Sequence, residues 1–422
     1  MRNFLDFHYL KKEKNDIEIE HFFDVEEVLI PLDFQEEYSI YKQKGDYIHI
    51  GEVIAKDINN FPIFSSVSGI FIEIVEKFYK KDKKIKFIKI KVDKKNNKAI
   101  FKSRKNYEKL TKKEFLKILK DYGLIDFNEK YTPIYKKFKE LKDDKIKYFI
   151  INGLETEPYL NMTNTIIYEK IEEFKKIIDF ILKLFKLENV LIIIENNKEL
   201  SNFLKSHLDK NIIIKRVPKL YPLQKENLII KYLFKKKYSR DLTKHKILML
   251  NFLSILDIYN AVIENKPFIE KIITVNGKGV EKPSVLLVPL GMKIKDILEY
   301  CFYYNNKCRQ IILDSAMEGE AIFDIELPVF RGTKAIIALN ENETEKIKPY
   351  KCINCGKCVN VCPMNLASLK FLDLSLNETE KIKKYNFNKC ISCGNCQYIC
   401  PTNQPLREKI YYLKKKLEEV DE

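Results

Sequence analysis

The fold of this chain is decided near its C-terminus by the stretch Cys352-Ile-Asn-Cys355-Gly-Lys-Cys358-Val-Asn-Val-Cys362-Pro363. A second stretch repeats the pattern as Cys390-Ile-Ser-Cys393-Gly-Asn-Cys396-Gln-Tyr-Ile-Cys400-Pro401. Both read C-x2-C-x2-C-x3-C-P, the spacing of bacterial ferredoxins that hold two clusters. In that arrangement three thiolates of one run bind one [4Fe–4S] cube, and the fourth binds the other cube.

This crossing predicts two sets of cluster ligands. Cluster one is expected to bind Cys352, Cys355, Cys358 and Cys400. Cluster two is expected to bind Cys390, Cys393, Cys396 and Cys362. Gly356 and Gly394 are expected to let the backbone approach the sulfurs, where a Cβ would crowd the cube.

Structural zinc is the main alternative, because C-x2-C pairs also make zinc sites. Zinc takes four ligands per ion and tolerates varied spacing. Two copies of one ferredoxin spacing, each followed by proline, favour iron–sulfur clusters instead. Disulfides are disfavoured, because the clusters need thiolates and the N-terminus has no secretory signal. The other two cysteines, Cys301 and Cys308, are interpreted as ordinary helix residues.

Composition places the chain among soluble multidomain proteins. Its 422 residues suggest two to four domains, and 45% hydrophobic residues are enough to form cores. No apolar run approaches the roughly 18 residues of a membrane-spanning helix. The net charge of +16 comes mostly from lysine in a chain rich in isoleucine and asparagine, which indicates genome bias and no nucleic-acid partner. The dense run from Lys80 to Lys98 is interpreted as a strand with a solvated lysine face, or as a contact for an anionic membrane or an acidic carrier protein.

The remaining patterns predict a multidomain fold of α/β and β units. We expect a barrel-sandwich domain over residues 1–105, because its strand and turn patterns resemble lipoyl-type domains. Short apolar strands alternate with helical stretches over 106–265, which predicts a parallel α/β domain. Residues 266–340 read as a smaller β-rich module, and residues 341–422 hold the cysteine runs and a closing helix.

The order of these units resembles the C subunit of the Rnf ion-translocating electron-transport complex. Besides the cysteine runs, the stretch Ile151-Asn-Gly-Leu-Glu155-Thr-Glu157-Pro-Tyr-Leu160 is similar to the family's I-N-G-x-E-x-E-P-Y-L. Ile194 to Lys198 is similar to its I-E-D-N-K, and Thr274 to Gly291 is similar to its β-grasp module of the soluble-ligand-binding (SLBB) type. The resemblance implies a domain like the 51 kDa flavoprotein of complex I over residues 106–265. Family members are taken to accept hydride from NADH and to pass electrons to a membrane partner.

Three loops depart from the family pattern. The family's G-x-G-G-A-G-F-P-T-x-x-K cradles flavin and nucleotide, but the matching stretch from Gly123 to Lys136 has lost the clustered glycines and carries Asp126 and Glu129. The Y-P-x-G-G-E-K loop is represented by Tyr221 to Glu226, and the G-G-P-M-M-G loop by Asp314 to Gly319. A phosphate cradle needs closely approaching backbone N–H groups, and carboxylates repel phosphate. FMN and NADH are therefore both doubtful cofactors, although drift around a working pocket is an open alternative.

The family likeness also nominates side chains of a nucleotide site. Glu155 and Glu157 match the family's acidic pair, and Lys136 matches its lysine by position. In a working site these carboxylates would meet ribose or nicotinamide. Alternatively, Asn152 and Glu157 cap the following helix, and Lys136 is one more surface lysine. No catalytic residue is predicted.

Three functions fit these motifs. The first is an electron-transfer subunit of an Rnf-type complex, relaying electrons through two [4Fe–4S] clusters between an NADH or ferredoxin side and membrane partners. The second is a self-contained flavin-dependent NADH:acceptor oxidoreductase, linked to corrinoids or to amino-acid reductases. The third is an adaptor whose clusters only stabilise the fold. The expected location for the first is the cytoplasm, peripherally at the inner face of the cell membrane, with the other subunits of the complex and ferredoxin as partners and no nucleic acid.

Overall fold

The computed structural model describes most of the chain in separate segments. These are residues 4–6, 18–32, 37–80, 83–97, 100–126, 132–139, 146–235, 246–303, 307–344, 348–372, 374, 378 and 385–421. Glu129 of the predicted flavin loop lies outside the described residues. Within these segments no helix is both long and apolar enough to cross a membrane.

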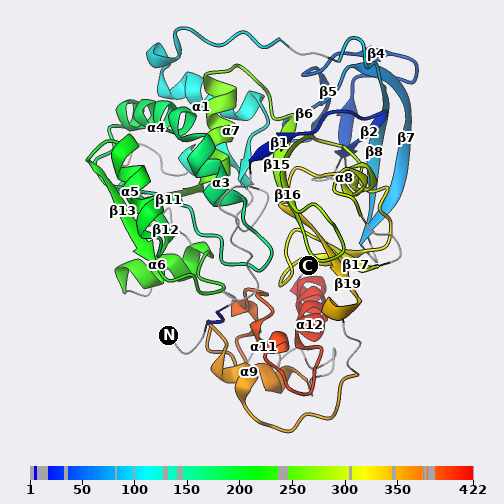
Figure 1. The fold of residues 1–422 in the computed structure, drawn as a ribbon, viewed down its shortest axis with the longest axis vertical. Coiled ribbons are helices and arrows are strands. Elements are labelled where there is room, and N and C mark those ends of the chain that lie inside the picture. The colour runs from blue at the N-terminus through cyan, green and yellow to red at the C-terminus, as the bar shows by residue number, and fades with distance from the viewer. Residues whose placement is uncertain are drawn as a thin grey trace.

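The described residues between Glu27 and Val92 form two antiparallel sheets (Figure 1). One has the order β2-β8-β7-β4 and the other β3-β5-β6. The strands are β2 (Glu27–Leu32), β3 (Tyr38–Ile40), β4 (Tyr47–Ile48), β5 (Val53–Asp57), β6 (Pro62–Phe64), β7 (Gly69–Lys80) and β8 (Lys83–Val92). Part of the lysine-rich run forms the strand β8, as predicted: Ile85 and Phe87 are buried, while Lys84 and Lys86 are exposed. Alternate side chains of a strand point to opposite faces, which explains this pattern.

The middle of the chain is a parallel α/β layer, as the alternating pattern predicts. Its sheet has the order β13-β12-β11-β14 with every neighbouring pair parallel. The strands are β11 (Tyr148–Asn152), β12 (Val190–Glu195), β13 (Ile212–Val217) and β14 (Ile247–Asn251). The helices are α1 (Lys112–Asp121), α2 (Ile134–Lys139), α3 (Met162–Glu169), α4 (Ile171–Phe185), α5 (Lys198–His207), α6 (Glu226–Phe234) and α7 (Phe252–Val262). A short antiparallel pair, β9 (Ile125–Asp126) and β10 (Thr132–Pro133), precedes α2.

Helices cover both faces of this sheet because its strands are apolar on both sides. Phe149 and Ile151 of β11 pack into the same core as α4 and α7, whereas Ile150 packs into a second core with α6. Phe174 of α4 stacks on Phe252 of α7, with ring centroids 4.3 Å apart. Burial on both faces is what parallel sheets require.

A six-stranded mixed sheet follows, in the order β1-β16-β15-β19-β17-β18. Its strands are β1 (Ile19–His21), β15 (Glu270–Asn276), β16 (Ser284–Pro289), β17 (Cys308–Leu313), β18 (Glu320–Ile322) and β19 (Ala335–Asn340). Helix α8 (Ile294–Tyr300) follows the β15–β16 hairpin. Strand β1 comes from the N-terminal segment and pairs in parallel with β16. Cys308 lies at the start of a strand, so its interpretation as a helix residue is wrong, and Cys301 follows directly after α8.

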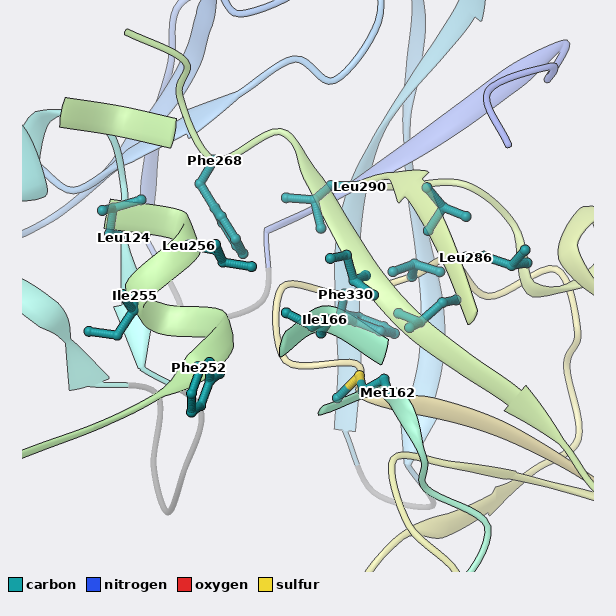
Figure 2. Close-up of a cluster of buried hydrophobic side chains, with 14 of the residues drawn as sticks. Leu124, Met162, Ile166, Phe252, Ile255, Leu256, Phe268, Leu286, Leu290 and Phe330 are labelled. Carbon is teal, nitrogen blue, oxygen red and sulfur yellow. The ribbon is translucent and has the colours of Figure 1, made fainter. Parts of the chain in front are cut away.

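One continuous core joins this sheet to the α/β layer. Figure 2 shows Met162 and Ile166 of α3 lying between the side chains of α7 and those of Leu286, in β16, and Phe330, in the loop that precedes β19. The α/β layer and the mixed sheet therefore share one hydrophobic core.

The C-terminal segment lies below both layers (Figure 1). It contains the one-turn helices α9 (Lys357–Asn360) and α11 (Asn395–Tyr398) and the long helix α12 (Leu406–Asp421). Its own small core is formed by Leu406, Ile410 and Leu413 of α12 with Phe371 and Leu374. The predicted closing helix is thus present.

The stacked pair between α4 and α7 offers a test of the α/β core. Phe174→Ala should lower the free energy of unfolding by about 3–5 kcal/mol, because it removes a buried ring and leaves a cavity. Lys176→Ala, at an exposed position of the same helix, should change it by less than about 0.5 kcal/mol. Urea unfolding followed by circular dichroism measures both, and equal effects of the two changes would contradict this packing.

Candidate functional site

The cysteines of the two runs surround two separate cavities. One cavity is lined by Cys352, Cys355, Cys358 and Cys400. The other is lined by Cys362, Cys390, Cys393 and Cys396. Each cavity therefore takes three cysteines from one run and the fourth from the other run, which is the grouping that the spacing predicts.

The two runs adopt the same local backbone. Asn354 and Ser392 both take a left-handed conformation, and their N–H groups donate to Cys352 Sγ at 3.5 Å and to Cys390 Sγ at 3.4 Å. Leu366 N–H donates to Cys362 Sγ at 3.3 Å, and Gln404 N–H donates to Cys400 Sγ at 3.4 Å. Matched N–H donors to sulfur are a feature of iron–sulfur sites, where they tune the reduction potential.

The glycines of the two runs share a backbone conformation that favours glycine. Gly356 and Gly394 have φ of +73° and +78° and begin α9 and α11. A Cβ on Gly356 would meet no protein atom, whereas a Cβ on Gly394 would lie 2.8 Å from the carbonyl oxygen of Met317. The close approach at Gly394 is thus to a neighbouring loop, while the positive φ explains both glycines.

The cavities suit a cationic group. Burial raises the pKa of Cys358, and the nearby thiols of Cys400 and Cys355 raise it further. Burial also raises the pKa of Cys396 to about 12, with Cys390 and Cys362 adding to the effect. Buried thiols crowded in this way become thiolates only beside compensating positive charge, which cluster iron supplies. Four thiols around each cavity are the donor set that a [4Fe–4S] cluster takes.

A third and larger cavity of about 490 Å³ lies between the α/β layer and the mixed sheet. Asn152 at the end of β11 and Asn251 at the end of β14 both line it. Strand β11 leads outward to β12 and β13 on one side, and β14 lies on its other side. The cavity thus sits at the carboxyl ends of parallel strands where the strand order reverses, which is the usual ligand position in such sheets.

The I-N-G-x-E-x-E stretch of this chain builds one wall of the cavity. Gly153 is needed because a Cβ there would lie 2.9 Å from the carbonyl oxygen of Ile193. Glu155 lines the cavity and accepts a hydrogen bond at 3.2 Å from Thr163 N–H, in the first turn of α3. Helix capping by Asn152 and Glu157 is a wrong prediction, because α3 begins after Asn161. Asn152 instead accepts a hydrogen bond from Leu154 N–H and donates one to the carbonyl oxygen of Gln224.

Glu157 is the most perturbed carboxyl group of this wall. It is 6% exposed, and its Oε1 accepts a hydrogen bond from Gln224 Nε2 at 3.3 Å. Its Oε2 is buried and has no hydrogen-bond partner in the part of the chain that the structure describes. Burial, together with the charge of Glu318, raises the pKa of Glu157 to about 8. Glu157 is consequently neutral at pH 7.

The structure separates Lys136 from this cavity. Lys136 is exposed on α2 and does not line the cavity. The next residue, Lys137, is the one turned inward: it forms ion pairs with Asp126 and with Glu226, the latter at 2.7 Å. Ser254 Oγ also donates to Asp126 at 3.1 Å. The carboxylate at the predicted phosphate position is thus held by neighbours inside the fold.

The two other glycine-poor loops supply side chains to the cavity. Gln224 and Lys225 come from the loop Tyr221–Glu226, and Glu318 comes from the loop Asp314–Gly319. Lys225 Nζ pairs with Glu318 Oε2 at 2.6 Å. Sequence reasoning marked these loops as departures from a pattern but did not identify them as a paired wall of the cavity.

Two family models match the chain. Residues 119–260 match the Nuo51 FMN-binding domain, and residues 351–404 match the 4Fe-4S dicluster domain. A solved NAD+-reducing [NiFe]-hydrogenase in the H2-reduced state is similar in fold, with a TM-score of 0.53, 11% identity, and coverage of 77% of this chain and 68% of that one.

Relatives that carry the name of a C subunit are similar over much of the chain. The C subunit of the proton-translocating ferredoxin:NAD(+) oxidoreductase complex of Clostridium ljungdahlii is 28% identical over 77% of this chain and 72% of its own length. The C subunit of the Na(+)-translocating ferredoxin:NAD(+) oxidoreductase complex of Acetobacterium woodii is 24% identical over 79% of this chain and 77% of its own. The C subunit of the ion-translocating oxidoreductase complex of Rhodobacter capsulatus is 30% identical, over 51% of this chain and 43% of its own.

The fold and the matches define an iron–sulfur protein that joins a Nuo51-type α/β domain to a 4Fe-4S dicluster domain. Within that class, the chain resembles the C subunit of Rnf-type ion-translocating oxidoreductase complexes, and the predicted resemblance is confirmed.

The pKa of Glu157 gives a pH test. Because its folded-state pKa of about 8 lies above its ordinary 4.5, the folded chain holds a proton that the unfolded chain releases. Stability should fall as pH rises from about 5 to about 8, by up to roughly 1.4 kcal/mol per pH unit from this group. Glu157→Gln should remove that slope, while Glu188→Gln, at an exposed carboxyl, should keep the wild-type profile. Unfolding midpoints measured across this range would contradict the assignment if Glu157→Gln ran parallel to wild type.

Proposed function

We propose that this chain is the electron-transfer subunit of an Rnf-type ion-translocating oxidoreductase complex. It relays single electrons through two [4Fe–4S] clusters between a soluble partner, on the NADH or ferredoxin side, and membrane subunits. The observation that carries this proposal is the gathering of eight cysteines around two cavities, four to each. The names of the relatives, which are C subunits of such complexes, support it.

The proposed ligands follow the crossed grouping. Cluster one takes Cys352, Cys355, Cys358 and Cys400. Cluster two takes Cys390, Cys393, Cys396 and Cys362. When bound, each cluster supplies one-electron redox chemistry, while the protein sets its potential through burial and N–H donors to sulfur. Cys355 is exposed and Cys393 and Cys396 are buried, so cluster one lies nearer the surface and cluster two nearer the protein interior.

The chain is proposed to bind FMN and NADH weakly or not at all. Beside the loop Gly123–Lys136, the carboxylates of Asp126 and Glu226 already neutralise Lys137. A phosphate bound there would therefore face two carboxylates. In the other two loops Gln224, Lys225 and Glu318 fill space and bond to neighbours. A phosphate cradle instead presents free backbone N–H groups at close range.

A flavin-dependent NADH:acceptor oxidoreductase is the second candidate. The cavity of about 490 Å³ at the reversal of strand order, within the match to the Nuo51 FMN-binding domain, favours it. Glu155 and Glu157 would then face the bound nucleotide. Flavin binding separates the two candidates.

Finer features of the fold support the same family assignment. The order β16-β15-β19-β17, with α8 after the first hairpin, supports an SLBB-like β-grasp module over residues 266–340. The two antiparallel sheets support a barrel-sandwich domain over residues 1–105. The α/β domain is placed at 106–265, and the ferredoxin-like domain with α12 at 341–422.

The proposed partners are other subunits of a membrane complex and, on the electron-donor side, a ferredoxin. The proposed location is the inner face of the cell membrane, held peripherally. The net charge of +16 and the lysines of β8 suit an acidic partner, and contacts of exposed charges weaken in salt.

Two clusters predict about eight iron and about eight labile sulfide per chain. Cys355→Ser should remove the spectroscopic signal of cluster one and leave that of cluster two. Cys308→Ser, outside both runs, should leave iron content unchanged. Iron analysis with low-temperature electron paramagnetic resonance measures both. Zinc in place of iron, or two intact signals in Cys355→Ser, would contradict the ligand assignment.

Anaerobic titration with FMN and then NADH tests the flavin proposal. We expect no tight binding of FMN and no bleaching of the clusters by NADH alone, because the phosphate cradle is missing. The C. ljungdahlii relative provides a comparison under the same conditions. Tight FMN binding, or reduction of the clusters by NADH, would establish the second candidate instead.

A further inference from the structure

A chain of side chains links the large cavity to the proposed cluster two. Lys225 Nζ lies 2.6 Å from Glu318 Oε2, and Tyr221 Oη lies 2.9 Å from Glu318 Oε1. The same hydroxyl lies 2.7 Å from the carbonyl oxygen of Cys393. Three contacts therefore lead from a cation on the cavity wall to the backbone of a proposed cluster ligand.

The Tyr221 end of this chain of contacts is closely packed. Tyr221 is fully buried and forms a small core with Met317 and Cys393. Gly394 is pressed against the Met317 carbonyl, as its missing Cβ allows. Arg407 of α12 donates to the carbonyl oxygen of Glu318 and, at 3.1 Å, to that of Gly319. Water is excluded from Tyr221, whereas the side chains of Lys225 and Glu318 are 14% and 25% exposed, so their charges are partly screened.

The two charged residues stand where this chain departs from the family pattern. Lys225 occupies the position of the second glycine in Y-P-x-G-G-E-K. Glu318 occupies the position of the second methionine in G-G-P-M-M-G. Independent drift would leave unrelated side chains at these positions, whereas here a cation and an anion meet at hydrogen-bond distance.

We propose that the Lys225–Glu318 ion pair, acting through Tyr221, sets the reduction potential of cluster two, so that this cluster responds to the charge of the pair itself. The inference rests on the proposed function, since it needs cluster two to be bound by its four cysteines. Lys225, Glu318 and Tyr221 are positioning and tuning residues, because none of them is a proposed ligand. Net charge and hydrogen bonding near the sulfurs are the levers by which proteins tune such clusters.

The sign of each effect follows from charge. One-electron reduction adds a negative charge to the cluster, so an uncompensated Glu318 carboxylate opposes it and an uncompensated Lys225 ammonium favours it. Lys225→Met should lower the potential of cluster two, and Glu318→Gln should raise it. Each shift is expected to change the reduction equilibrium about tenfold, which is about 59 mV for one electron. The double variant should return close to wild type, because both charges are gone.

The experiment is an anaerobic redox titration of the full chain with dithionite, followed by electron paramagnetic resonance. Cluster one is the internal control, and its potential should stay constant. Lys170→Met and Glu173→Gln are matched controls, since these residues form a 3.4 Å ion pair that lines the same cavity but contacts neither Tyr221 nor Glu318 among the described contacts. Their potentials for cluster two should equal the wild-type value.

The possible outcomes distinguish a failure of the proposed function from a failure of the proposed charge coupling. A wild-type chain without two cluster signals would overturn the proposed function itself. Two signals, with cluster two unshifted in Lys225→Met and Glu318→Gln, would overturn only the coupling. If a single variant lost the cluster-two signal and the double variant regained it, the charge coupling would be supported. Loss in the single and double variants alike would show a purely structural contact and overturn the inference.

Discussion

The rest of this structure depends on the crossing of two cysteines. Cys362 leaves its own run to join Cys390, Cys393 and Cys396, and Cys400 joins the first run in exchange. Neither cavity can form from one run alone, so the two runs must fold against each other and α12 must close over them. This places the segment beneath the carboxyl ends of the parallel strands, where Met364 and Ile391 pack against the second core of the α/β layer.

The three loops that lack the family's glycines form ion pairs with their side chains. In the family pattern they present backbone to a phosphate. In this chain their side chains pair with one another: Lys137 with Asp126 and Glu226, and Lys225 with Glu318. Removing one partner of such a pair is costly where the pair is buried, because the other charge is then left uncompensated. The cavity survives, but its wall carries charges that already have partners and a neutral Glu157. In the proposed coupling this wall acts on Cys393 through Tyr221, whereas a phosphate cradle would present free backbone N–H groups.

The sequence predicted much of this, and the failures have physical reasons. The cysteine spacing predicted the two groups of four that line the two small cavities. Continuous apolar runs identified β11 and β12, because strands buried on both faces are apolar throughout, and helical spacing identified α4. Capping by Asn152 and Glu157 was wrong because Asn161 begins α3, a boundary that composition does not fix. Lys136 was chosen by position in a motif, yet the helical phase of α2 turns Lys137 inward instead. The Lys225–Glu318 pair joins residues far apart in the chain, and a single sequence carries no signal for such a contact.

The central claim is that two clusters are bound in crossed fashion, and diffraction at the iron absorption edge of anaerobically grown crystals tests it most directly. The account predicts two four-iron peaks in the anomalous map, with Cys400 bound to the cluster of Cys352, Cys355 and Cys358, and Cys362 bound to the cluster of Cys390, Cys393 and Cys396. One metal atom in place of four at either cavity, or Cys400 bound to the cluster of its own run, would contradict the account.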